Sequence, residues 1–136
     1  MFRFIFLLLL IPLVHACKPS SGARLDEWMQ PNGKVKVLCT TAMISSLVRE
    51  VGGEMVDCLT LIQGESDPHS YQLVKGDDEK LAFADIIFYN GLGLEHGPSL
   101  AERLRLNPNA FAVGDFLVEK DPENAIIDNG SLDPHI

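Results

Sequence analysis

The run Asp85-Ile86-Ile87-Phe88-Tyr89-Asn90-Gly91 decides the fold class of this chain. Residues 85–89 are almost entirely apolar, whereas a strand with one wet face alternates polar and apolar residues. A near-continuous apolar run is typical of a parallel strand that helices cover on both faces. Asn90-Gly91 then ends the run with turn-forming residues. The stretch therefore predicts a buried strand in a mostly parallel sheet, and so an α/β fold.

Strand-like and helix-like segments alternate on either side of this run. Strands are expected at residues 35–39, 56–62, 85–89 and 110–113, and helices at residues 42–51, 77–83 and 98–106. In the first helix, Met43, Leu47 and Val51 are expected to form the buried face. Residues 114–132 read as a loop-like stretch. This order predicts a mostly parallel four-stranded sheet flanked by helices.

Two copies of one tripeptide carry the strongest chemical signal. Asp67-Pro68-His69 follows the second expected strand, and Asp133-Pro134-His135 follows the fourth. Proline fixes its own φ at about −65° and extends the residue before it, so each tripeptide holds an imidazole stiffly. The Asp two residues upstream is placed to orient a ring N–H. Because ligands bind beyond the carboxyl ends of parallel strands, we expect His69 and His135 to meet there and bind a metal.

Other candidate residues are weaker. Glu95-His96 is a carboxylate–imidazole pair, but it stands next to Gly97-Pro98 and is interpreted as a solvated approach to the next helix. Glu65 and Asp67 could each ligate a metal directly, and Asp67 is expected to support His69 instead. The chain has no Gly-x-Ser-x-Gly, no Walker-type glycine loop and no His-Glu-x-x-His. No catalytic residue and no residue for an organic cofactor is therefore assigned.

Residues 1–16 have the pattern of an export signal. Arg3 supplies a positive charge, and the apolar run at residues 4–14 is too short to span a bilayer. Residues 13–17 resemble a bacterial lipobox that ends at Cys17, and plain cleavage after Ala16 also fits. The protein is therefore expected to be exported to the periplasm, with a lipid anchor at Cys17 as one alternative.

The rest of the chain divides into a tether and one domain. Residues 17–34 are polar and rich in turn formers, which predicts a flexible tether, with Trp28 as an exception that is expected to pack on the domain. Residues 35–136 form the domain. The net charge of −8 argues against a nucleic-acid partner, which favours a basic face. Cys39 and Cys58 form either a disulfide or two small buried thiols in predicted strands.

These residues resemble the N-terminal half of the family 9 (cluster A-I) metal-binding receptors of ABC importers. The motifs that carry the resemblance are Thr40-Thr41, Gly52-Gly53, Asp67-Pro68-His69-Ser70-Tyr71, Ala84-Asp85-Ile86-Ile87, Asn90-Gly91, Leu94-Glu95 and Asp133-Pro134-His135. The resemblance implies a monomeric receptor, not an enzyme, that hands its metal to a permease and its ATPase. It also implies two lobes joined by a long helix, with two metal ligands from each lobe.

By this resemblance, His69 and His135 are the ligands from the first lobe. The family is about twice the size of this chain, so the chain is expected to be a fragment without the C-terminal lobe. Two imidazoles suit zinc, iron, nickel or copper, whereas carboxylate oxygens shift the preference toward manganese. Zinc-specific relatives often carry a His-rich loop before the second ligand, and residues 114–132 contain no His. Fe²⁺ or Mn²⁺ is therefore preferred, with Zn²⁺ as the competitor.

Two other functions stay open at this point. An exported metalloenzyme would keep an open coordination position for water and would need a general base near the histidines, which the sequence does not indicate. A surface adhesin on the same fold would need an exposed aromatic or apolar patch. The aromatic residues fall mostly at core-like positions.

Overall fold

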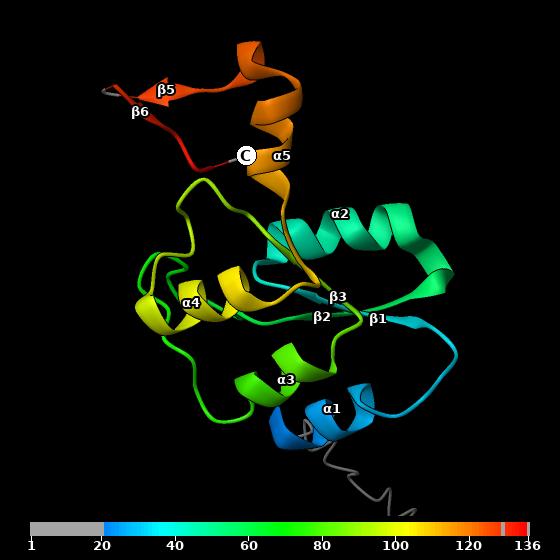
Figure 1. Ribbon diagram of the computed structural model, residues 1–136. Helices are drawn as coiled ribbons and strands as arrows, with labels where there is room; N and C mark the ends of the chain where they lie inside the picture. The colour runs from blue at the N-terminus through cyan, green and yellow to red at the C-terminus, as the bar shows by residue number, and fades with distance from the viewer. Residues whose placement is uncertain (1–20, 129, 136) are drawn as a thin grey trace, which may run out of the picture.

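A four-stranded parallel sheet forms the centre of the structure, a computed structural model that describes residues 21–128 and 130–135 (Figure 1). The strands are β1 (Val35–Cys39), β2 (Val56–Thr60), β3 (Ile86–Tyr89) and β4 (Ala110–Ala112). They lie in the order β2-β1-β3-β4, and all three pairings are parallel. The α/β class and the parallel four-stranded sheet are thus confirmed.

Helices cover the two faces of the sheet unequally (Figure 1). The helices are α1 (Ser21–Trp28), α2 (Ala42–Gly52), α3 (Asp77–Phe83), α4 (Pro98–Leu106) and α5 (Val113–Lys120). Trp28, Leu81 and Leu100, from α1, α3 and α4, pack with strand residues on one face. On the other face, Ile44 of α2 packs on Val37 and Cys39. The larger part of the core therefore lies on the side of α1, α3 and α4.

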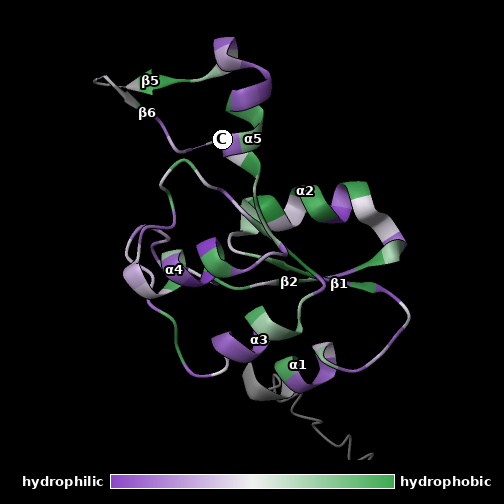
Figure 2. Cartoon of the chain, viewed as in Figure 1, coloured by the Kyte–Doolittle hydropathy of each residue, from purple (hydrophilic) through white to green (hydrophobic). Residues whose placement is uncertain are grey.

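The buried face of α2 is not the predicted one. Met43, Leu47 and Val51 are 48%, 58% and 89% exposed, whereas Ile44 is buried and Val48 packs against the core. Both sets have apolar residues four positions apart, so helical periodicity alone fits either face. Hydrophobic residues recur along the whole helix (Figure 2). Packing of α2 against β1 determines which of these two faces is buried.

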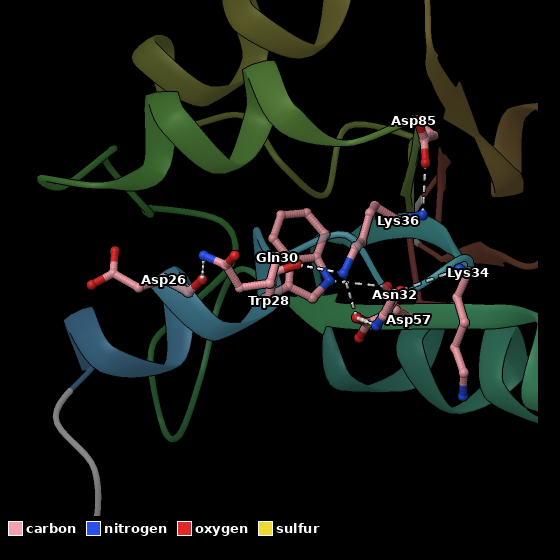
Figure 3. Close-up of polar contacts among 8 residues, drawn as sticks. All are labelled: Asp26, Trp28, Gln30, Asn32, Lys34, Lys36, Asp57 and Asp85. Atoms are coloured by element: carbon pink, nitrogen blue, oxygen red, sulfur yellow. Dashed lines mark hydrogen bonds and ion pairs between the residues drawn. The ribbon is translucent and has the colours of Figure 1, made fainter.

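Residues 21–28 form helix α1 within the stretch expected to be a tether, and Trp28, the expected exception, packs on the domain. Trp28 is 5% exposed, and its Nε1 donates a hydrogen bond to the Asp57 carbonyl over 3.0 Å. Lys36 donates to the Trp28 carbonyl and pairs with the Asp57 carboxylate over 2.7 Å (Figure 3). These contacts fix the segment before β1 against the sheet. The signal at residues 1–16, Cys17 and the start of the tether lie outside the described residues.

Residues 114–128 and 130–132 contain more regular secondary structure than the loop-like stretch that was predicted. Helix α5 starts directly after β4, and it is followed by a 3-10 turn, η2 (Pro122–Asn124). Strands β5 (Ile127–Asp128) and β6 (Ser131–Leu132) then form a short antiparallel pair. The Gly114 N–H donates to the Asn90 carbonyl over 2.7 Å, and a side chain at Gly114 would collide with that oxygen. This close approach places the first turn of α5 beside the residue that ends β3.

Cys39 and Cys58 are free thiols in the structure, with their Sγ atoms 3.5 Å apart on neighbouring strands. The hydrogen bond between the thiols lowers the pKa of Cys58 and raises that of Cys39, and the Arg49 guanidinium favours the Cys58 thiolate. The Cys58 thiol is therefore the more nucleophilic of the two.

No helix in the described part of the chain is long and apolar enough to cross a membrane.

Replacing Trp28 by Ala should lower the free energy of unfolding by about 3 kcal/mol, because a large buried side chain is lost from the core. Trp28 also packs edge-on against Phe83, with ring centroids 5.6 Å apart. The measurement is urea denaturation followed by circular dichroism. Gln30→Ala, at an exposed position, is the control and should change stability by less than about 0.5 kcal/mol. Equal stability of the Trp28→Ala variant and the unmodified chain would mean that this segment is a tether.

Candidate metal site

Three imidazoles meet beyond the carboxyl end of the parallel sheet. His69 lies in the loop between β2 and α3, and His96 lies in the loop between β3 and α4. His135 follows β6. The ring centroid of His69 is 5.5 Å from that of His135 and 5.2 Å from that of His96. The structure therefore brings the two predicted histidines together and adds a third.

Asp67 shapes the first Asp-Pro-His motif through the backbone. Its Oδ1 accepts a hydrogen bond from the His69 N–H over 2.9 Å, and its Oδ2 accepts one from the Ser70 hydroxyl over 2.9 Å. These two donors, the His69 N–H first, hold the pKa of Asp67 below its ordinary value. The expected contact with the His69 ring is not formed. Asp67 therefore fixes the turn and leaves the ring nitrogens of His69 without a hydrogen-bond partner among the described residues.

The second motif repeats this turn and adds a contact with the ring. Asp133 Oδ1 accepts hydrogen bonds from the His135 N–H over 2.9 Å and from the ring Nδ1 over 2.7 Å. Both contacts lower the pKa of Asp133, so its carboxylate is ionised near neutral pH. An ionised carboxylate only accepts, so Nδ1 carries the proton. In the neutral ring of His135 the lone pair is then on Nε2, which is the form that a metal ligand requires.

A buried amide connects the second motif to the sheet. Asn90 is fully buried at the end of β3, and its Nδ2 donates to the carbonyls of Pro134 and Gly91. Its Oδ1 is buried without a partner in the described part of the chain. Asn90 is thus a side-chain link between the sheet and the segment that carries His135.

Glu95 is not solvated, contrary to the prediction. It is 6% exposed, and its Oε1 accepts hydrogen bonds from the Thr40 hydroxyl over 2.6 Å and the Asn90 N–H over 2.8 Å. Its Oε2 accepts from the Gly91 N–H over 3.1 Å. The carboxylate therefore ties the loop after β3 to the end of β1. His96, the next residue, is exposed but stands beside His69 rather than apart from the site.

The family model described as "Zinc-uptake complex component A periplasmic" matches residues 37–136. The chain belongs to this zinc-uptake component A family. It is similar to the metal-binding protein YtgA of Chlamydia trachomatis, at 38% identity over 91% of this chain and 36% of that protein. It is also similar to the iron ABC transporter substrate-binding lipoprotein MtsA of Streptococcus pyogenes, at 33% identity over 90% of this chain and 40% of that protein.

Solved structures of this family share the fold. Fe(III)-bound YtgA from Chlamydia trachomatis superposes with a TM-score of 0.69 and 41% identity, over 76% of this chain and 36% of that one. The periplasmic zinc-binding protein TroA from Treponema pallidum gives a TM-score of 0.63 and 31% identity, over 76% and 37%. The chain thus spans little more than a third of the length of these relatives.

Sequence reasoning did not predict that His96 lies next to His69. The signal was present, because His96 follows β3 as His69 follows β2, and loops after parallel strands gather at one edge. Within residues 21–128 and 130–135, no three His, Cys, Asp or Glu side chains are already arranged to hold a metal ion. The rings of His96 and His135 are therefore exposed on either side of His69 and do not surround a common point.

Replacing Asn90 by Leu should loosen the segment that carries His135, because the Pro134 carbonyl loses its donor. The lost hydrogen bond is worth about 1 kcal/mol, so deuterium exchange in residues 125–135 should accelerate roughly fivefold. Mass spectrometry of the peptides measures this. Asn109→Ala, at an exposed position, is the control and should leave exchange there unchanged. Unchanged exchange in the Asn90→Leu variant would contradict the assigned link.

Proposed function

We propose that this chain is the metal-binding lobe of a substrate-binding protein that captures a divalent transition metal outside the cytoplasmic membrane. The protein delivers the metal to an ABC permease and its ATPase for import. The observation that carries the proposal is the juxtaposition of the His69 and His135 rings, 5.5 Å apart, in a member of the zinc-uptake component A family. The names of the related SsaB and MtsA proteins, both substrate-binding lipoproteins of ABC transporters, support it.

His69 and His135 are the proposed ligands of this lobe. The Nε2 atom of His135 is available because Nδ1 is held by Asp133. Asp67 and Asp133 add two carboxylates beside the rings, and their lowered pKa values keep them ionised. Their negative charge raises the local concentration of cations at this edge of the sheet. Binding needs further ligands, which water supplies when the metal first arrives.

The proposed metal is Fe²⁺ or Mn²⁺, with Zn²⁺ as the competitor. Among the related structures, YtgA is bound to Fe(III), and a periplasmic metal-binding protein of Candidatus Liberibacter asiaticus is bound to manganese. TroA is described as a periplasmic zinc-binding protein. Imidazole binds all of these ions and generally favours Zn²⁺ and Fe²⁺ over Mn²⁺ in affinity. Selection for the physiological metal therefore depends on supply and on the remaining ligands as well as on this lobe.

The proposed location is the periplasm. The signal-like pattern of residues 1–16 supports export, and the lipobox-like residues 13–17 support a lipid anchor at Cys17. The related SsaB and MtsA proteins are named lipoproteins. The protein is proposed to work as a monomer that docks on its permease.

A catalytic role is the weaker alternative. A metalloenzyme needs a general base that can reach metal-bound water. Three carboxylates of these loops, Asp67, Asp133 and Glu95, each accept hydrogen bonds that shape the backbone. The family relatives named here are metal-binding transport proteins. We therefore propose a receptor and not an enzyme.

Replacing either His69 or His135 by Ala in the full-length protein should lower metal affinity by at least about tenfold, since the site loses one direct ligand. Isothermal titration calorimetry with Fe²⁺, Mn²⁺ and Zn²⁺ in competition with a chelator measures the change. Ser66→Ala, an exposed position in the His69 loop, is the control and should bind like the unmodified protein. Wild-type affinity in both histidine variants would refute the proposed site.

A further inference from the structure

Two thiols lie side by side on the face of the sheet that α2 covers. Cys39 ends the interior strand β1, and Cys58 lies in β2, the edge strand of the order β2-β1-β3-β4. Both pack in the small core cluster that contains Ile44. Their Sγ atoms are 3.5 Å apart, and both thiols are free. The two sulfurs are therefore joined by a hydrogen bond and not by a covalent bond.

The strand register keeps this pair from closing into a disulfide. In the pairing of β1 with β2, the partner of Cys39 is Thr60, two residues beyond Cys58. Two residues span about 6.6 Å along a strand and neighbouring strands lie about 4.8 Å apart, so the Cα atoms of such a diagonal pair are about 8 Å apart. Cysteines with Cα atoms more than about 7 Å apart are bridged only if the backbone moves. The sheet therefore holds two thiols in contact and keeps them free.

Burial and a neighbouring cation decide which of the two sulfurs carries the negative charge. Cys39 is fully buried, and burial disfavours an ionised thiol. Cys58 is only half-buried in the edge strand. The Arg49 guanidinium donates to the Cys58 backbone carbonyl over 3.1 Å, which places a positive charge beside this residue. The Cys39 S–H is therefore the donor in the hydrogen bond, and the Cys58 sulfur is the acceptor that ionises.

The acidity of the two thiols follows this arrangement. The hydrogen bond from Cys39 is the largest effect and lowers the pKa of Cys58 to about 7, with burial opposing it and Arg49 adding to it. The same hydrogen bond, together with burial, raises the pKa of Cys39. The thiolate is the nucleophile in disulfide exchange, and a thiol whose pKa is close to the ambient pH attacks fastest. Cys58 is therefore the reactive thiol of the pair near neutral pH.

We propose that Cys58 is a reversible modification site that forms mixed disulfides with small-molecule disulfides, and that Cys39 activates it through the hydrogen bond between their sulfurs. This site is independent of the proposed metal binding. The Cys58 thiolate, whose proton has gone to water, attacks one sulfur of the small disulfide and forms a new S–S bond. The old S–S bond breaks, and the other half leaves as a thiolate that takes up a proton. One disulfide is thus exchanged for another, so the reaction needs no further oxidant, and an added thiol reverses it.

Cys39 takes part as a positioning residue that keeps its proton. It would have to attack the modified Cys58 sulfur to displace the bound group, and the diagonal register does not allow the bond that would result. The mixed disulfide at Cys58 is therefore the end point of the reaction until an external thiol removes it.

The test treats the reduced full-length protein with oxidised glutathione and maps the modified peptides by mass spectrometry. Trypsin separates the two cysteines, because it cleaves after Lys36, Arg49 and Lys75. One glutathionyl group is expected on the peptide 50–75 and none on the peptide 37–49, and added dithiothreitol should remove it. A disulfide that links the two peptides, or a folded protein in which neither peptide is modified, would overturn the proposal.

Two substitutions of Cys39 test its activating role. Cys39→Ala removes the donor, so the pH midpoint of the glutathionylation rate should rise from about 7 toward about 8.5, the value of an ordinary cysteine. At pH 7 the rate should fall by up to about threefold, because the greater nucleophilicity of the thiolate partly offsets its smaller fraction. Cys39→Ser keeps a hydrogen-bond donor at this position and should retain most of the rate and the low midpoint.

The remaining outcomes also decide the matter. Equal pH midpoints in the unmodified protein and in Cys39→Ala, both folded by circular dichroism, would overturn the role of Cys39. If Cys39→Ala does not fold, the midpoint of the unmodified protein and the rate in Cys39→Ser decide instead. A midpoint of about 8.5 in the unmodified protein would show that Cys58 is an ordinary thiol and would overturn the proposal.

Discussion

The buried carboxylate of Glu95 is the interaction on which the rest of the site depends. A charged group that is almost fully removed from water is tolerated only when hydrogen bonds satisfy it. Glu95 receives them from the Thr40 hydroxyl and from the N–H groups of Asn90 and Gly91. One side chain therefore joins the end of β1 to the end of β3. It also sets the course of the loop that carries His96.

From this carboxylate the polar contacts extend outward to the histidines. Asn90 is held by Glu95 through its backbone, and its side chain then reaches the carbonyl of Pro134. The parallel register brings the loops after these strands together, because it places the carboxyl ends of β1, β2 and β3 at one edge of the sheet. Residues far apart in the sequence thus form one site, although no single loop contains more than one of its histidines.

The fold class and the meeting of His69 with His135 could be predicted from the sequence, because both follow from local patterns. The apolar run that became β3 signals a covered parallel strand, and loops after such strands converge. Trp28 was expected to pack on the domain, but helix α1 was not predicted, since the contacts that fix its end come from Asp57 and Lys36. The role of Glu95 was hidden for a related reason. One partner, Thr40, is 55 residues away in the sequence, and the others are the adjacent Asn90 and Gly91, while neighbouring Gly97-Pro98 indicated only a turn.

The central claim, that the imidazoles at this edge of the sheet bind a transition metal, is tested most directly by nuclear magnetic resonance of the histidine rings. Long-range ¹H–¹⁵N spectra of the ¹⁵N-labelled full-length protein report each ring nitrogen as Zn²⁺, a diamagnetic probe, is added. The account predicts that the Nε2 signal of His135 and one ring nitrogen of His69 shift to values typical of metal-bound imidazole at one equivalent of Zn²⁺. Ring nitrogens of both residues that stay at their metal-free positions, with Zn²⁺ bound to the protein, would contradict it.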